Sequence, residues 1–372
     1  MNAVYEYLFM GLMLIVIFGA SVTMVEIMSV PMQGVSERQE LQVTGEKILS
    51  QMLSSYGSPA NWGSSPTNTN PTYFGLAQQM ETETTRQTYV LDINKVQRLN
   101  PNDPYRLDPN AVQKALNLEK TFGFALQVMP IFNVNVMRQG VADSFTVNVS
   151  WQEDGLPVSN AKVTACMFLA SVSNGSTTYY QTLQRTSTTG IDGETLQPLD
   201  FTPYGLAENR LKVLVVVVDY LGLKSSHTFS ADDWQTVPAY RVGEYLLINN
   251  VYQTLSSNPT LYEILAIKDF PADPPQYDYK IISVSTTLTD TGTVMGDFRL
   301  YAITNPEPTA MGLVVVQKDG VYYLAFDSKE VNFNFSTTPD LSIFPPGVRL
   351  QRLVTIEDSP YYAQLYLWRL SY

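Results

Sequence analysis

Cysteine and histidine are nearly missing from this sequence, which contains only Cys166 and His227. One cysteine cannot form a disulfide within the chain, and the two residues together cannot supply a Cys/His zinc site. We therefore expect packing alone to stabilise the fold, with neither a metal nor a cofactor. Cys166 lies in the strand-like run TACMFLA, where a buried structural thiol is favoured over a nucleophile.

Basic residues are also scarce. The 23 Lys and Arg stand against 35 Asp and Glu, which gives a formal net charge of -12. A chain of this charge opposes the phosphate neutralisation that nucleic-acid binding requires, so we expect no nucleic-acid partner. The first basic residue is Arg38. Because no Lys or Arg precedes it, the positive-inside rule does not predict the orientation of an N-terminal membrane helix from that side.

The sequence lacks the motifs of the common enzyme classes. A Ser-His-Asp site would have to combine His227 with Asp232 or Asp233, and no G-x-S-x-G elbow accompanies them. No phosphate-binding loop occurs, and adjacent acids in turns are ordinarily solvated. We expect no enzymatic activity. A calcium ion held by loop oxygens around Asp290 and Thr291 stays an open alternative.

The N-terminal region contains a long apolar run, YLFMGLMLIVIFGASVTMV at residues 7–25, bracketed by Glu6 and Glu26. These nineteen uncharged residues form roughly 28 Å of helix, close to the hydrocarbon thickness of a bilayer. We expect a retained membrane helix. Two alternatives stay open: a cleaved secretory signal, which should begin with basic residues, and a helix buried in a globular core, which suits a shorter run.

A second helical pattern follows the first. Pro31 and Gly34 should interrupt the first helix, and Ser36 can serve as the N-cap of the next one. The apolar side chains of this pattern fall mainly on one face, at Leu41, Ile48, Leu49, Met52 and Leu53. Two interpretations stay open: this amphipathic stem packs on its own head domain, or it packs against identical neighbouring chains.

Strand patterns separated by turn residues dominate the chain beyond residue 122. In SFTVNVSW at residues 144–151, Phe145, Val147, Val149 and Trp151 alternate with polar residues, which predicts a strand with one solvated face. The apolar run LKVLVVVVDY at residues 211–220 predicts a buried central strand. Hairpins are predicted around residues 318–320 and in the closing segment, which should turn at residues 358–360.

Before these strands, two short helices are predicted at residues 92–99 and 109–118, capped by Asp92 and Asp108. The fold class is therefore mainly β with a long N-terminal α-helix, and comprises an antiparallel β-sandwich plus a second β-rich domain. The predicted boundaries are 1–56 for the transmembrane and amphipathic helix, 57–133 for a linker and small α/β cover, 134–233 for the sandwich and 234–372 for the C-terminal β domain.

The sandwich region resembles a known module. GLPVSNAKVTA at residues 155–165, followed by TTGIDGE at residues 188–194, is similar to the Ig-like, transthyretin-like surface module also seen as the carboxypeptidase regulatory domain. The matching positions are Pro157, Val158, Asn160, Ala161, Val163 and the turn at residues 189–193. The resemblance covers roughly residues 134–230 and implies an Ig-like spacer or adhesive unit without catalysis.

The segments NAVYEYLFMGLMLIVIFGASV and EKILSQMLSSYGSPANWGS resemble the N-terminal region of archaeal type IV pilin-like and uncharacterised membrane-anchored surface proteins. Many pilins carry a Glu at the fifth position that neutralises a neighbour's terminal amine, and removal of the initiator Met would place Glu6 there. The chain lacks the basic and small residues that a prepilin peptidase expects, so processing stays open, and Glu6 can equally be an interfacial residue. The resemblance implies a homo-oligomer whose helix contacts lipid or neighbouring copies through Glu6, Leu12, Ile15, Leu41, Ile48 and Met52.

The long polar body favours a location at the cell membrane with an extracellular body, or in an extracellular filament. Sequons at Asn148, Asn174 and Asn334 would allow glycosylation there. The leading functional hypothesis is a non-enzymatic structural surface protein, a pilin-like subunit of an extracellular filament or surface assembly. A singly anchored adhesin or binding protein of unknown ligand ranks nearly level, and an anchored hydrolase ranks third.

Overall fold

The protein is mainly β in the computed structural model, which describes residues 38–65, 70–79, 89–119, 121–140, 143–173, 177–202, 211–254, 260–269, 276–304, 311–338, 346–357 and 359–370. The apolar run at residues 7–25 lies outside these residues, together with Glu6, Leu12 and Ile15. Within the described ranges, no helix combines the length and the apolar character needed to cross a bilayer.

Helices are few and short among the described residues. Residues 38–54 are helical, and α2 (Ile93–Gln97), α3 (Pro109–Ala115) and the 3-10 turn η2 (Asp232–Trp234) follow. The strands are β1 (Val90–Leu91), β2 (Phe122–Pro130), β3 (Phe132–Arg138), β4 (Ser144–Trp151), β5 (Lys162–Ser173), β6 (Thr177–Thr188), β7 (Leu199–Asp200), β8 (Leu211–Tyr220), β9 (Leu223–Phe229), β10 (Thr236–Val242), β11 (Tyr245–Asn249), β12 (Gln253–Thr254), β13 (Thr260–Asp269), β14 (Gln276–Met295), β15 (Phe298–Ile303), β16 (Met311–Lys318), β17 (Val321–Phe326), β18 (Phe333–Ser336), β19 (Gly347–Ile356) and β20 (Ser359–Arg369).

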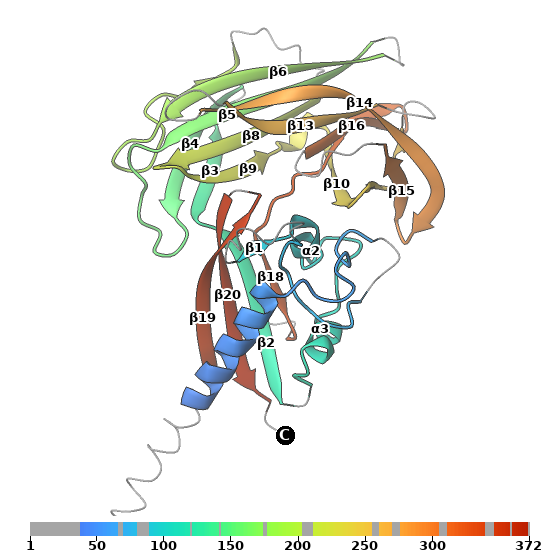
Figure 1. Ribbon diagram of the computed structural model, residues 1–372. Helices are drawn as coiled ribbons and strands as arrows, with labels where there is room; N and C mark the ends of the chain where they lie inside the picture. Colours follow the sequence, from blue (N-terminus) through green and yellow to red (C-terminus); the bar gives the residue numbers. More distant parts are fainter. Residues whose placement is uncertain are drawn as a thin grey trace, which may run out of the picture.

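The lower part of the molecule is a five-stranded sheet of order β1-β19-β20-β2-β18 (Figure 1). Helix 38–54 lies across one face of this sheet, and α2 and α3 cover the same face further along. The helix buries Ile48, Leu49, Met52 and Leu53 against apolar side chains of β2, β19 and β20. Burial of each such side chain stabilises the fold by about 1.5–3 kcal/mol, so this face holds the helix firmly to the head.

The C-terminal end of helix 38–54 is fixed by an extended segment. The amide of Leu76 donates to the carbonyl of Met52 at 2.8 Å, and the amide of Ala77 donates to the carbonyl of Ser55 at 2.9 Å. These bonds satisfy carbonyls that a helix end otherwise leaves without partners. A Cβ on Gly75 would overlap the Ser55 carbonyl, so only glycine permits this close approach.

Above this sheet lies a β-sandwich. The sheet β3-β4-β7 faces the sheet β6-β5-β8-β9, and the two inner faces form one core. Phe145, Val147 and Val149 of β4 are fully buried in it, and their polar neighbours alternate with them along the strand. The alternation predicted for this strand is confirmed, but the face predicted to be solvated is only partly so, because Thr146 is buried.

A third layer covers the other face of the sandwich. The eight strands β12-β16-β13-β14-β15-β11-β10-β17 form a sheet that closes on itself, because β16 also pairs with β17. Leu313 and Val315 of β16 point outward onto β8, whereas Val314 and Val316 point into the interior of the closed sheet. Strand β8 is thus buried on both faces, which explains its continuous apolar run and confirms its predicted central position.

The chain crosses between these layers in a way that differs from the predicted domain order. The sequence predicts one C-terminal β domain at residues 234–372, but strands β10 to β17 form the closed sheet while β18, β19 and β20 join β2 below. The predicted closing hairpin is confirmed, but its turn comes earlier than the predicted residues 358–360, because Ser359 and Pro360 already pair in β20 with Ile356 and Thr355. Its inner face is mainly apolar, with Val348, Leu350, Val354 and Ile356 on β19, so it pairs with the strand and helix that can cover that face.

Replacing Met52 by Ala should lower the free energy of unfolding of the chain by about 2–5 kcal/mol, because it removes a fully buried side chain from this core. The measurement is chemical denaturation of the detergent-solubilised protein, followed by tryptophan fluorescence. Val43→Ala is the matched control on the same helix, since Val43 is 55% exposed, and should change stability by less than about 0.5 kcal/mol. Equal stabilities for the two variants would contradict the docking of this helix on its own head.

Candidate functional site, a groove beside strand β18

A groove runs along β18 where the α2–α3 loop meets the two neighbouring sheets. It consists of two adjoining hollows of about 480 and about 540 Å³, which share Pro101 and Asn334 in their linings. These volumes lie in the range of small-molecule sites. The first hollow is lined by Leu99, Pro101, Arg106, Leu107, Asp108, Pro109, Asn334, Phe335, Ser336 and Thr338. We define the two hollows together as the β18 groove.

The loop that forms one wall of the β18 groove is held between two capped helices. Asp92 caps α2 by accepting from the amide of Asn94, and Asp108 caps α3 by accepting from the amide of Asn110, as the sequence predicts. Pro109 occupies the start of α3, where its missing N–H costs nothing. The chain between the caps therefore has fixed ends.

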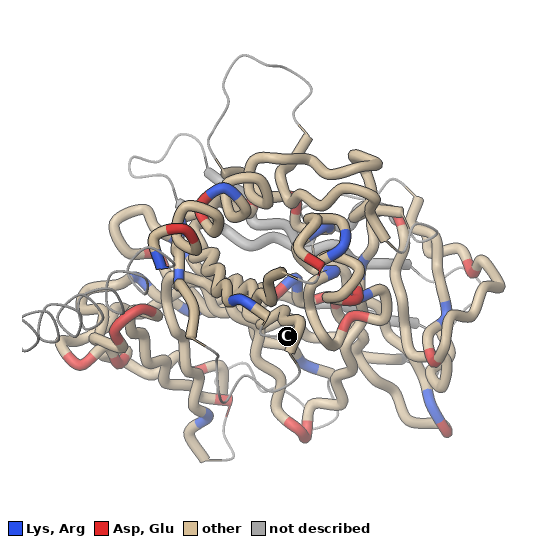
Figure 2. The backbone as a smooth tube through the Cα atoms, turned by 90° about the horizontal axis from the view of Figure 1, so that it is seen from below, with Lys and Arg blue, Asp and Glu red and all other residues tan. Residues whose placement is uncertain are grey.

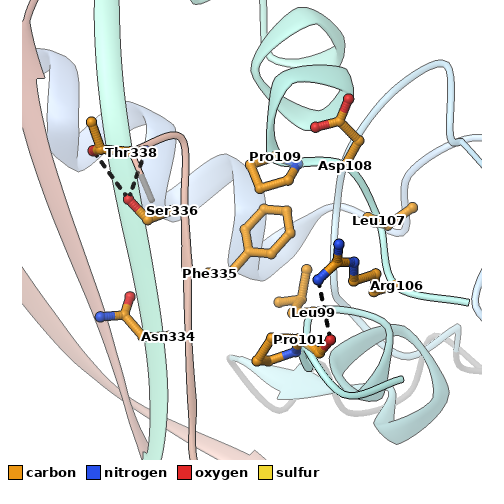
Figure 3. Close-up of a pocket in the computed structure, with 10 residues that line it drawn as sticks. All are labelled: Leu99, Pro101, Arg106, Leu107, Asp108, Pro109, Asn334, Phe335, Ser336 and Thr338. Carbon is orange, nitrogen blue, oxygen red and sulfur yellow. Dashed lines mark hydrogen bonds between the residues drawn. The ribbon is translucent and has the colours of Figure 1, made fainter. Parts of the chain in front are cut away.

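Both apolar and polar side chains face the first hollow. Figure 3 shows the ring of Phe335 pointing toward the loop, where Leu99 and Arg106 lie, while the neighbouring Asn334 points to the other side of the strand. The Arg106 guanidinium donates to the carbonyl of Pro101 at 3.3 Å and stays exposed. The hollow thus combines an apolar floor with a polar rim, as ligand sites usually do.

Two fully buried cations lie beneath the loop. Lys95 donates to the carbonyls of Tyr56 and Ala77 at 3.0 and 2.8 Å, and Arg98 donates to the carbonyl of Trp62 at 2.6 Å. Burial lowers the pKa of both cations, and nearby acids oppose that shift. These bonds tie the extended segment after helix 38–54 to α2, so the back of the groove is rigid.

Asp103 lies inside the loop and is only 3% exposed. It accepts a hydrogen bond from the amide of Tyr105 at 2.7 Å. Burial raises the pKa of Asp103 to about 7, the Tyr105 amide and Arg98 oppose this rise, and Asp327 adds to it. A carboxyl group that titrates near neutrality is therefore placed where the loop meets the closed sheet.

Asp327 follows β17 and approaches Asp103 from the opposite side. It is 5% exposed, and its Oδ1 accepts from the amide of Lys329 at 3.4 Å. Burial raises the pKa of Asp327, while Lys329 and Arg241 oppose the rise. Its Oδ2 is buried and has no hydrogen-bond partner. A small hollow of about 10 Å³ lies between these groups and shares Gln97 and Asp327 with the second hollow of the groove. We call this small hollow the deep end of the β18 groove.

Further ion pairs surround this end of the groove. Lys329 contacts Glu357 at 3.3 Å, and burial raises the pKa of that glutamate. His227 Nδ1 lies 3.3 Å from Glu330. The histidine is therefore paired with an acid of the groove segment. Asp233, its possible triad partner by sequence, is instead held by Arg138 at 2.8 Å, which lowers the pKa of that carboxyl.

Two other candidates have structural partners. Cys166 is fully buried in the core between the second and third layers, which confirms the interpretation of a structural thiol. Asp290, proposed with Thr291 for calcium, forms an ion pair with Arg299 and accepts from the amide of Gly292 at 2.9 Å. The arginine occupies the face that a calcium ion would need.

The predicted stem residues divide between core and surface. Ile48 and Met52 are buried in the lower core, and Leu41 is partly buried against it. For Ile48 and Met52 the structure therefore favours the first of the two interpretations, in which the stem packs on its own head, over contacts with neighbouring chains. The expectation for Glu6, Leu12 and Ile15 falls outside the described residues.

The sequon residues differ in surroundings. Asn148 lies partly exposed on β4, with its Nδ2 3.5 Å from the carbonyl of Asp192. Asn334 has a buried Oδ1 without a partner, next to Gln127 across the β18–β2 pair. Asn174 lies outside the described residues. Both described positions are partly exposed.

Sequence reasoning did not find the buried acids of the groove. Asp103 stands in NPNDPY and Asp327 in DSKE, and such polar turn segments ordinarily predict solvated loops. Only the packing of two segments more than 200 residues apart buries them. The available signal was the concentration of Asn and Pro around Asp103, which marks a loop of fixed shape but does not indicate its burial.

The stability of the Asp103→Asn variant relative to the wild type should rise with pH between about 4 and 7. With its pKa raised from 3.8 to about 7, Asp103 holds a proton in the folded state that the unfolded chain releases in this window. Wild-type stability from this group is present at low pH and is lost as the pH rises, by at most about 1.4 kcal/mol per unit. Denaturation curves at pH 4.5, 6 and 8 measure the difference, and a constant difference would contradict the buried carboxyl.

No cluster of three or more metal-ligating side chains occurs among the described residues. No protein-family model matches the chain, and no curated protein matches it. The role of the groove therefore has to be argued from its geometry and charges alone.

Proposed function

We propose that this protein is a membrane-tethered, non-enzymatic structural surface protein, a pilin-like subunit of an extracellular filament or surface assembly. The observation that carries the proposal is the fixed attachment of helix 38–54 to the head. Arg369 near the C-terminus also pairs with Glu40 of this helix at 2.7 Å, although both side chains are exposed and the pair contributes little. Because the stem is fixed to the head, the position of its N-terminal end determines the position of the whole head.

The apolar run at residues 7–25 is close to this fixed stem in sequence. Residues 26–37 separate the two, and twelve residues reach at most about 40 Å even when fully extended. The membrane or neighbouring copies would therefore contact the protein at the lower end of the sheet in Figure 1. In this proposal Glu6, Leu12 and Ile15 make the contacts with lipid or with identical helices, and the copies associate there.

The charge of the head supports placement in water outside the cell. Residues 38–372 carry a formal net charge of -9, because Glu6, Glu26 and Glu37 supply the rest of the chain's -12, and Figure 2 shows Lys and Arg positions scattered among Asp and Glu. An acidic surface of this kind keeps a large body soluble and away from anionic lipid. The facing antiparallel sheets between β3 and β9 support the part of the proposal that treats this region as an Ig-like spacer.

Exposed apolar turns of the sandwich support contacts between copies. Ile191 and Leu221 are 89% and 87% exposed. Leu221 and Gly222 form the two-residue turn between β8 and β9, both with positive φ, and Leu221 has φ 53°. Asn or Gly is the residue that such a turn favours, so a leucine here costs stability and supports a role in contact.

The alternative function, a singly anchored adhesin or ligand-binding protein, is supported by the β18 groove. Its two hollows have the volume of a ligand site, and its deep end contains a buried acceptor without a partner. The same head serves either function, because none of the residues that line the groove belongs to the stem helix 38–54. Polymerisation separates the two: the filament subunit requires it and the single anchor does not.

The test of the anchor is truncation. The full chain should sediment with membranes or filaments after a carbonate wash, whereas residues 38–372 should be released as a folded soluble protein, because helix 38–54 keeps its core contacts. Cryo-electron microscopy of sheared surface material should then show copies joined through their N-terminal helices. Release of the intact full chain as a soluble monomer would refute the proposal, and membrane retention without polymers would favour the single anchor.

Leu221→Asn should raise the free energy of unfolding by about 1 kcal/mol, because asparagine tolerates the left-handed conformation that strains leucine. The same change should weaken association of copies if the turn makes contacts between them. Leu156→Asn is the control, since Leu156 is 59% exposed without a positive φ and should gain no stability. A Leu221→Asn protein that is no more stable than the wild type would show that the turn carries no strain.

A further inference from the structure

The deep end of the β18 groove contains a hydrogen-bond acceptor that the protein leaves unused. Asp327 Oδ2 is buried and has no hydrogen-bond partner, and the residue as a whole is only 5% exposed. A buried carboxylate oxygen without a donor costs several kcal/mol in general and so indicates an absent group that supplies one. Asp327 lines both the small hollow and the larger second hollow, so a molecule in the groove can reach it.

The size of the deep end limits what can enter it. Its volume of about 10 Å³ accommodates a single oxygen-sized group. A calcium ion would need six to eight oxygen ligands at about 2.3–2.6 Å, and the cations Arg241 and Lys329 line the same hollow. A hydroxyl group meets both limits, because it fits the volume and donates one hydrogen bond.

The charges around the groove compensate one another. Asp327 and Glu330 line the second hollow with Lys329, and Arg241 lies at its deep end. Asp103 also lines the deep end, and burial raises the pKa of that carboxyl to about 7, so the three acids and two bases leave only a small net field to select an anion or a cation. The ligand that suits this lining is therefore uncharged.

The wider part of the groove is lined with carboxamides. Gln97, Asn100, Asn102 and Asn332 all face the second hollow, and the half-buried ring of Tyr240 lies among them. A carboxamide donates and accepts hydrogen bonds, as a hydroxyl group does, so several amides match several hydroxyls on one ligand. An aromatic face beside them suits the C–H surface of a ring-shaped polyol.

We propose that the β18 groove binds a neutral carbohydrate, with one sugar hydroxyl in the deep end donating to Asp327 Oδ2. The carboxamides contact the remaining hydroxyls, and Tyr240 contacts the apolar face of the ring. This inference goes beyond the structural role proposed above. It assigns the groove a ligand class and does not depend on whether the chain polymerises.

The test uses the full chain in a zwitterionic detergent, because detergents with sugar headgroups would compete. A panel of neutral methyl glycosides of hexoses, N-acetylhexosamines and pentoses, with their short oligomers, is titrated by calorimetry. At least one should bind saturably. In its monodeoxy series, loss of the hydroxyl that reaches Asp327 should weaken binding at least about tenfold, as expected when a buried acceptor loses its donor.

The variant Asp327→Asn keeps the shape of the side chain and removes the charge of the acceptor. It should weaken binding of the parent glycoside at least about tenfold and should no longer discriminate against the critical monodeoxy analogue. Gln253→Ala, on the exposed edge strand β12 outside the groove, is the control and should bind as the wild type does. If Asp327→Asn does not fold, Asn102→Ala at the exposed rim of the groove replaces it and should also weaken binding.

Three outcomes overturn the proposal: no neutral glycoside binds, only charged ligands bind, or Asp327→Asn binds the parent and its monodeoxy analogues as the wild type does. These outcomes are separate from those of the truncation test, which reports on membrane retention and polymers. A protein that fails to polymerise but binds a glycoside would keep the inference and change the proposed function.

Discussion

The packing of helix 38–54 on the C-terminal hairpin is the contact on which the lower half of the molecule depends. The hairpin pairs with β2, and the inner face of that sheet receives the helix together with α2 and α3. The apolar face of a sheet has to be covered, and no single neighbouring segment in the sequence is long enough to do so. The cover is therefore assembled from the N-terminal third of the chain and the sheet largely from its C-terminal end.

The α2–α3 loop and β18 gain their positions from this same contact. The extended segment after helix 38–54 is tied to α2 by Lys95 and Arg98, whose donors are directed at main-chain carbonyls. In this chain with one cysteine, such buried cations hold separate segments together, as disulfides do in many extracellular domains. Each cation is tolerable in the core because its donors are satisfied. The buried acid Asp327 is less completely satisfied, because its Oδ2 has no hydrogen-bond partner, and this difference distinguishes the groove from the core around the two cations.

Much of the local structure could be predicted from the sequence, because it is encoded by short patterns. Strand β8 has the predicted bounds, β4 alternates as predicted, and Asp92 and Asp108 cap the helices assigned to them. All of these features depend on neighbours within about ten residues, where periodicity and capping rules act directly.

The arrangement of the layers could not be predicted in the same way. A strand such as β16, with Val314 facing one core and Val315 another, has the same apolar pattern as any buried strand. The pattern indicates burial on both faces and does not name the partners. For the same reason, Asp103 and Asp327 each resembled a solvated turn acid until the fold brought their segments together.

The large sequence separation of the stem contacts constrains how the protein can form. Glu40 and Arg369 are paired across 329 residues, and β20 supplies the centre of the sheet that the helix covers. Contacts of such separation form late, since the loop entropy of the whole chain must be overcome first. The sheet that holds the stem cannot exist until the last strands have been made, so the stem helix stays uncovered during synthesis. An N-terminal apolar run that inserts into a membrane early would keep that uncovered amphipathic helix at the membrane surface and away from other chains, until the C-terminal hairpin provides its partner.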